Sequence, residues 1–253
     1  MMKRLLLYPF LLAVLLSPLP VSAALSGQDI VQRVEDLLWG QTSEGQYEMR
    51  ITTPHWQRTL ELQVWMERPE KTFIRILSPA KEAGTGSLRI GSEMWNYLPK
   101  VERTIKIPPS MMLQPWMGSD FTNDDLVKES SIVNDYSHAL VAEEKQEGEV
   151  IYRIESIPKP DAAVVWGKLV YEVRRDDLMP LRLSYYDERG RLIKVLSFSE
   201  VREMGGRTLP TRWEMRPVAK PENSTVIRLR EVRFDIPLDR KIFTLRNLRR
   251  GKP

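Results

Sequence analysis

The stretch Leu60-Glu61-Leu62-Gln63-Val64-Trp65-Met66 decides the fold class of this 253-residue chain. Apolar residues recur in it at every second position, which is the period of a β-strand with one face against a core. The same period recurs at residues 47–51, 150–154, 169–173, 181–185, 192–198, 211–215 and 226–234. The sequence therefore predicts a mainly β protein whose antiparallel strands each have one buried and one exposed face.

Turn residues separate these runs, among them the glycines at 91, 148, 190 and 205–206. Their spacing, about ten to fifteen residues, predicts one long meander without an internal domain boundary. A single order of about ten or eleven strands favours a strongly curled sheet, and we expect a half-open antiparallel β-barrel.

One segment near the N-terminus has the period of a helix. Apolar residues recur at helical spacing over residues 26–39. Ser26 is the expected N-cap, Asp29 lies in the first turn where a negative charge suits the helix dipole, and Gly40 is the expected stop.

The side chains of metal and nucleophile chemistry are scarce. The chain has no cysteine and only two histidines, His55 and His138. This excludes thiol catalysis and zinc-cysteine sites, and it argues against a Ser-His-Asp triad. We expect no enzyme activity, no cofactor and no metal. A hydrolase of envelope material is the weakest hypothesis, and it would need an essential Asp or His.

Residues 1–23 have the features of a cleavable signal peptide. Lys3 and Arg4 precede an aliphatic run at 5–16, and small residues follow at Val21-Ser22-Ala23. The run is shorter than the roughly 20 residues that span a bilayer. We therefore expect an exported, periplasmic protein whose single domain covers 24–253. Cleavage would remove two of the four excess positive charges. Along most strands the remaining charges alternate in sign, which argues against nucleic-acid binding, and only the tail with Arg246, Arg249, Arg250 and Lys252 is locally basic.

A methionine-rich insert interrupts the strand pattern between residues 100 and 128. Pro108 and Pro109 end the preceding strand. Thr122 is the expected cap of a short helix, with Asp125 at its third position. Methionine packs around irregular partners, so short helices here would cover the open end of a curled sheet. The insert is either a core plug that never opens or a lid that does.

Two blocks of sequence resemble a known family. They are GSEMWNYLP at 91–99 and MGSDFTNDDL at 117–126, with later agreement at 180–187, 206–211 and 243–244. The chain resembles the LolA-like outer-membrane lipoprotein-sorting family, and more closely its uncharacterised branch named after the treponemal TP-0789 protein. The resemblance implies a half-open barrel with an N-terminal helix and short lid helices in its concave face.

The resemblance also implies a periplasmic carrier that shields acyl chains of a lipoprotein or lipid. Its partners would be an inner-membrane transporter of the RND or ABC type and an outer-membrane acceptor. The alternative is an accessory subunit that docks on such a transporter and carries nothing. The residues we expect to bind lipid are the strand positions Leu60, Leu62, Val64, Met66, Trp95 and Tyr97, and the insert positions Met111, Met112, Trp116 and Phe121. As a gate, Trp116 should help to retain lipid, so Trp116→Ala should reduce retention.

Overall fold

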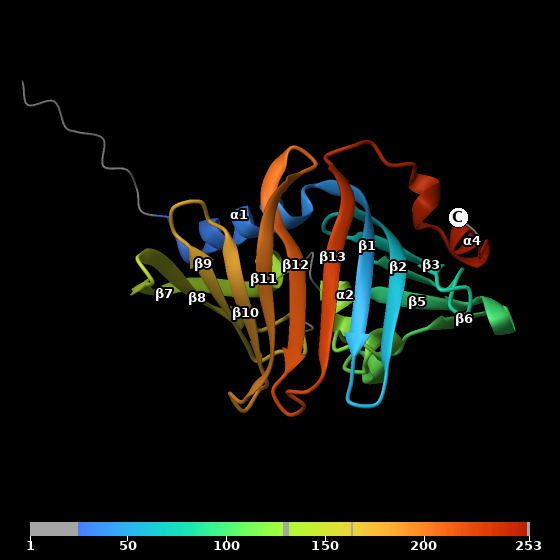
Figure 1. The fold of residues 1–253 in the computed structure, drawn as a ribbon, viewed down its shortest axis with the longest axis horizontal. Helices are drawn as coiled ribbons and strands as arrows, with labels where there is room; N and C mark the ends of the chain where they lie inside the picture. The colour runs from blue at the N-terminus through green and yellow to red at the C-terminus, as the bar shows by residue number, and fades with distance from the viewer. Residues whose placement is uncertain (1–24, 129–131, 163, 252–253) are drawn as a thin grey trace, which may run out of the picture.

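The computed structural model describes residues 25–128, 132–162 and 164–251, which contain one 13-stranded antiparallel sheet (Figure 1). The predicted signal peptide, residues 1–23, lies outside the described residues. The strands are β1 Thr42–Thr52, β2 Gln57–Glu67, β3 Lys71–Ser78, β4 Gly86–Ile90, β5 Glu93–Leu98, β6 Arg103–Lys106, β7 Tyr136–Gln146, β8 Glu149–Pro158, β9 Lys168–Arg174, β10 Pro180–Tyr186, β11 Leu192–Met204, β12 Arg207–Pro217 and β13 Ser224–Phe234.

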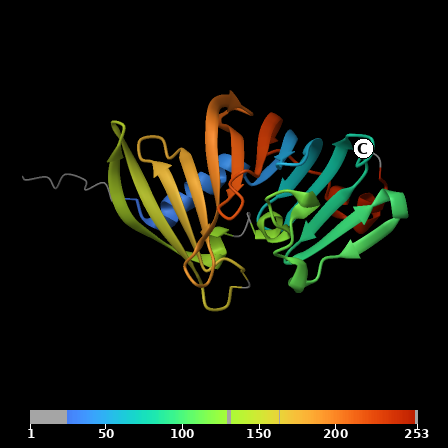
Figure 2. The same cartoon turned by 60° about the horizontal axis from the view of Figure 1, so that its bottom comes forward.

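The sheet is curled and open. Its strand order is β6-β5-β4-β3-β2-β1-β13-β12-β11-β10-β9-β8-β7, so β6 and β7 form its two edges and the sheet does not close into a barrel. Figure 2 shows two wings, β7–β10 and β3–β6, that rise on either side of a concave face. The helical segments are α1 Gly27–Trp39, α2 Asn123–Lys128, α3 Ile132–Asp135, α4 Leu245–Arg249, η1 Pro99–Val101, η2 Pro109–Met111, η3 Trp116–Gly118 and η4 Arg240–Phe243.

The predicted mainly β, half-open fold is confirmed, but the sheet has more strands than the ten or eleven expected. The alternating runs of the sequence correspond to β1, β2 and β8–β13, and β3 and β4 are among the strands that they miss. Strand β3 is buried over five consecutive residues, Thr72 to Ile76, and β4 over four, Gly86 to Arg89. Strands covered on both faces lose the alternation of apolar and polar residues. Strand β6 has only four residues and is the strand that the sequence predicts just before Pro108 and Pro109.

Helix α1 begins and ends where the sequence predicts. Ser26 and Asp29 form a reciprocal capping box at its start, and Gly40 with φ of 64° ends it. Its apolar face packs in the concave face of the sheet, beside β7, β8 and β12. Gly27 allows this approach, because a Cβ there would lie 2.8–2.9 Å from backbone atoms of β7. Within the described ranges no helix has the length and hydropathy needed to cross a membrane.

The outer face of β3–β5 carries a second, smaller core. Phe73, Leu88 and Tyr97 pack there against Phe243 and Leu248 of the C-terminal segment.

The buried guanidinium of Arg75 fixes this C-terminal segment to the sheet. It donates to the carbonyl oxygens of Asn247 and Leu248, at 2.7 and 3.0 Å, and to that of Gly84 at 2.9 Å. Cations stabilise the carbonyl end of a helix. Burial lowers the pKa of Arg75 to about 10, so the side chain still carries its charge at neutral pH.

Candidate functional site

The concave face encloses an apolar cavity between the sheet and the insert. Its volume is about 50 Å³. This is room for one or two water molecules and far too little for an acyl chain. The wall comes from α1, β1–β3, β12 and β13, and the roof from the insert. The lining residues are Trp39, Tyr47, Met49, Leu62, Val64, Met66, Thr72, Ile74, Trp116, Phe121, Leu126, Trp213 and Ile227.

Two aromatic side chains of the insert are buried against the cavity. Trp116 and Phe121 are each only 1% exposed. Their backbones are paired, since the Trp116 amide donates to the Phe121 carbonyl at 2.8 Å. The Trp116 indole nitrogen donates to the Ser87 hydroxyl on β4 at 2.9 Å, so the ring has a polar partner at its buried end. The insert therefore lies in the concave face with both aromatic rings buried.

Separate polar contacts tie the turn after Trp116 to the sheet. Thr225 on β13 donates to the Asp120 carboxylate at 2.7 Å and accepts from the Asp120 amide at 2.9 Å. Arg58 on β2 donates to the Met117 carbonyl and lies 3.6 Å from Glu82. Burial raises the pKa of Asp120, and the hydrogen bond from Thr225 opposes that rise.

Helix α2 is tied to strand β11 by a buried ion pair. Thr122 and Asp125 form the predicted cap, in which the Thr122 amide donates to the Asp125 carboxylate and the Asp125 amide donates to the Thr122 hydroxyl. The same carboxylate pairs with Lys194 on β11, and both side chains are at most 4% exposed. The Lys194 ammonium also lies 4.7 Å from the ring of Trp166 and 4.9 Å from that of Tyr185. The insert is thus held by contacts to β2, β4, β11 and β13.

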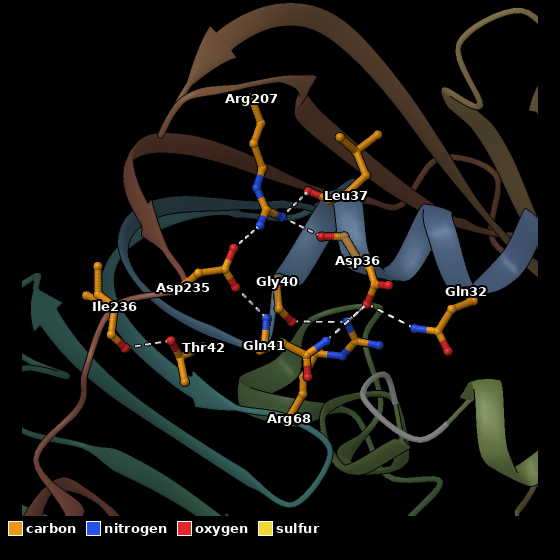
Figure 3. Close-up of polar contacts among 10 residues, drawn as sticks. All are labelled: Gln32, Asp36, Leu37, Gly40, Gln41, Thr42, Arg68, Arg207, Asp235 and Ile236. Atoms are coloured by element: carbon orange, nitrogen blue, oxygen red, sulfur yellow. Dashed lines mark hydrogen bonds and ion pairs between the residues drawn. The ribbon is translucent and has the colours of Figure 1, made fainter.

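Two arginines hold helix α1 at its C-terminal end (Figure 3). Arg68, in the turn after β2, donates to the Asp36 carboxylate at 2.8 Å. Arg207 on β12 donates to carbonyl oxygens of the last helical turn and pairs with Asp235. These cations oppose the negative end of the helix dipole, and α1 has no basic residue of its own in its last turn. These contacts join the C-terminal end of α1 to the turn after β2 and to β12.

A buried carboxyl group lies on the sheet side of α1. Glu35 is 3% exposed and accepts a hydrogen bond from the Tyr171 hydroxyl at 3.2 Å, and its Oε2 has no hydrogen-bond partner among the described residues. Burial raises the pKa of Glu35 to about 7, although Arg68 acts in the opposite direction. The folded protein therefore keeps this proton to a higher pH than the unfolded chain does.

Replacement of Glu35 should change how stability depends on pH. Between about pH 4.5 and pH 7 the unfolded chain releases the proton and the folded protein retains it, so stability falls as pH rises through this window. Glu35→Gln removes that loss, and at pH 8 it should gain up to about 3 kcal/mol more than at pH 4.5. Urea unfolding of both proteins at the two pH values measures the difference. An effect of equal size at both pH values would contradict the prediction.

The structure brings together only part of the residues predicted from the sequence. Leu62, Val64, Met66, Trp116 and Phe121 line the cavity. Leu60 and Met112 belong to the surrounding core.

The remaining three predicted residues lie elsewhere. Trp95 and Tyr97 pack in the second core on the outer face of the sheet, and Met111 is 43% exposed.

Sequence reasoning missed the polar side chains that hold the insert, which are Arg58, Asp120, Lys194 and Thr225. The sequence did contain one signal for Lys194. Lys194 precedes buried Leu196 by two residues, so it is a charge on the inward face of an alternating strand. In the ranges that the structure describes, no three His, Cys, Asp or Glu side chains gather as a metal site.

Comparisons with known proteins agree with this architecture. A family described as "Uncharacterized protein" matches residues 68–250. A DUF1329 family protein from Desulfovibrio piger is similar in structure, with 27% identity and a TM-score of 0.79 over 88% of this chain and 97% of that one. A search of curated proteins finds no match.

Two further solved structures share the fold. One is a LolA superfamily protein from Nitrosomonas europaea, with 23% identity and a TM-score of 0.77 over 88% of this chain and 100% of that one. The other is a putative outer membrane lipoprotein-sorting protein domain from Vibrio parahaemolyticus, with 24% identity and a TM-score of 0.74 over 88% of this chain and 98% of that one. At these identities the likeness concerns the fold alone.

Proposed function

We propose that this chain, which belongs to the family whose model matches residues 68–250 and has the fold of LolA-like proteins, is a periplasmic carrier of acyl chains. The acyl chain of a lipoprotein or lipid takes the place of the insert in the concave face. The protein then passes the acyl chain from an inner-membrane exporter toward the outer membrane. The observation that carries the proposal is the apolar cavity roofed by a separately anchored insert.

The free energies permit loading when the insert moves out. An acyl chain of about 16 carbons gains roughly 12 kcal/mol when it leaves water, at about 0.8 kcal/mol per methylene. Exposure of the Trp116 and Phe121 side chains costs roughly 5 kcal/mol in return. Broken polar contacts raise that cost, so the net affinity is moderate. A carrier needs this balance, since it must also release its load.

The position of Trp116 reverses the effect expected from the sequence alone. Its ring occupies the cavity and competes with an incoming chain. Trp116→Ala lowers the free energy needed to empty the site, and it should tighten binding of a fluorescent fatty acid at least tenfold. Titration of the probe, together with native mass spectrometry of co-purified lipid, measures this effect.

Trp65→Ala provides the matched control. Trp65 is a half-buried tryptophan of the second core, with its ring centroid 5.4 Å from that of Phe73. Its removal should leave probe binding unchanged. If the two variants bind the probe equally, Trp116 does not compete with the ligand. If neither variant nor the wild type binds it, the carrier proposal fails.

One observation favours a second candidate function. The cavity holds only about 50 Å³ with the insert in place, and a docking subunit of an inner-membrane transporter would need no more. Capture of such a transporter from solubilised membranes, by a protein that binds no acyl probe, would support this alternative over the carrier.

A further inference from the structure

The C-terminal segment, residues 239–250, carries a concentration of unneutralised positive charge. Arg240, Lys241, Arg246, Arg249 and Arg250 are all exposed. No described residue forms an ion pair with any of the five. Asp239, the one acidic residue of the segment, accepts from the Lys241 backbone amide at 2.8 Å instead.

The arginines on strands β9–β13 are neutralised by ion pairs, unlike those of the C-terminal segment. Every arginine on strands β9–β13 forms an ion pair with an Asp or Glu side chain. These residues are Arg174, Arg182, Arg202, Arg207, Arg212, Arg216, Arg228, Arg230 and Arg233. The C-terminal segment therefore differs from strands β9–β13, whose arginines are all paired.

The segment presents its cations from a rigid platform. Phe243 and Leu248 are buried in the second core, and Arg75 holds the carbonyl end of α4. Between η4 and α4 lies an open groove of about 590 Å³ with both polar and apolar surface, lined by Asp239, Lys241, Ile242, Thr244, Arg246, Asn247 and Arg250. Figure 1 shows the two short helices standing together at one end of the molecule, on the outer side of β3.

We propose that this segment docks the protein on the surface of an anionic phospholipid bilayer. Clustered Lys and Arg side chains bind anionic head groups, and each adds to the attraction within a Debye length of the surface. Half-buried Ile242 and Leu245 lie among the cations and can contact the head-group region of a bilayer. A soluble polyanion offers no apolar region for these two side chains. The groove has the polar donors that suit a phosphodiester.

The docking surface is separate from the acyl cavity. The cavity opens on the concave face, whereas the C-terminal segment covers the outer face of β3–β5. Docking therefore goes beyond the proposed carrier function and does not depend on it. A protein held at the membrane by this segment keeps its concave face free of the contact.

Vesicle co-sedimentation tests the proposal. Wild-type protein should sediment with phosphatidylcholine vesicles that contain about 30 mol % phosphatidylglycerol and remain in solution with phosphatidylcholine alone, and added salt should release it. The triple variant Lys241→Gln, Arg246→Gln and Arg250→Gln should bind the anionic vesicles at least tenfold more weakly. Acyl-probe binding by the same variant should be unchanged, which separates a failure of docking from a failure of the carrier.

The control triple variant is Lys145→Gln, Arg189→Gln and Lys220→Gln, which loses the same charge from exposed positions elsewhere. It should sediment like the wild type. Equal losses in the two triple variants would show attraction by net charge and overturn the assignment. Equal binding to neutral and anionic vesicles would also overturn it. So would a tighter complex with an RNA oligomer, because that would identify a general polyanion site.

Discussion

A protein carrying Asp120→Cys and Thr225→Cys is expected to stop taking up acyl probes when oxidised and to recover on reduction. The two native side chains already touch, with 2.7 Å between the Asp120 carboxylate and the Thr225 hydroxyl. A disulfide there would hold the insert on β13. With the insert in place the cavity is about 50 Å³, so uptake should fall at least about a hundredfold.

The chain suits this experiment because it contains no cysteine. Each single-cysteine protein, treated with oxidant, controls for loss of the native hydrogen bond. A second disulfide, from His138→Cys and Ser156→Cys, controls for oxidation itself. These residues face each other on β7 and β8, with 2.7 Å between the His138 Nδ1 and the Ser156 Oγ. Full uptake by the locked protein would mean that the insert is not the gate, and the carrier mechanism given above would be wrong.

Lys194→Met is expected to destabilise the protein by about 3–5 kcal/mol. The substitution leaves the Asp125 carboxylate without its cation at a site where both side chains are at most 4% exposed. The double variant Lys194→Met and Asp125→Asn should recover most of that loss, because a neutral amide still accepts from the Thr122 amide. Urea unfolding measures stability, and limited proteolysis within 108–126 reports whether the insert has loosened.

An exposed ion pair gives the comparison for this effect. Arg230 pairs with Glu48 on the outer face, where the arginine side chain is 58% exposed. Arg230→Met should cost at most about 1 kcal/mol. If Lys194→Met costs no more than Arg230→Met, the buried pair does not anchor α2. A double variant less stable than Lys194→Met alone would contradict the charge argument.

Local patterns were enough to predict α1, α2 and most of the strands. The capping residues Ser26 and Asp29, and again Thr122 and Asp125, act within a single turn, so their spacing in the sequence is sufficient. Strands β3 and β4 were not predicted, because residues far along the chain cover their outer face and remove the alternation of apolar and polar positions. Leu248 and Leu88 belong to the same buried cluster although they lie 160 residues apart in the sequence. The sequence of β4 alone does not predict that contact.

The candidate site was predictable only in its apolar half. The wall residues follow from alternation, and the insert from its methionine and aromatic content. Trp95 was placed near the wall, yet adjacent residues of a strand point to opposite faces, and Met94 is the one that enters the larger core. The anchors could not be paired in advance, since Asp120 and Thr225 lie 105 residues apart.

The unpaired edges of the sheet have a consequence for what it can hold. In a closed barrel, a fixed number of hydrogen-bonded strands sets the bore. Here β6 and β7 are not joined to each other, and a change in twist can spread the wings while every ladder between neighbouring strands stays intact. The width of the trough is therefore not set by closure of the sheet, in contrast to the fixed bore of a barrel.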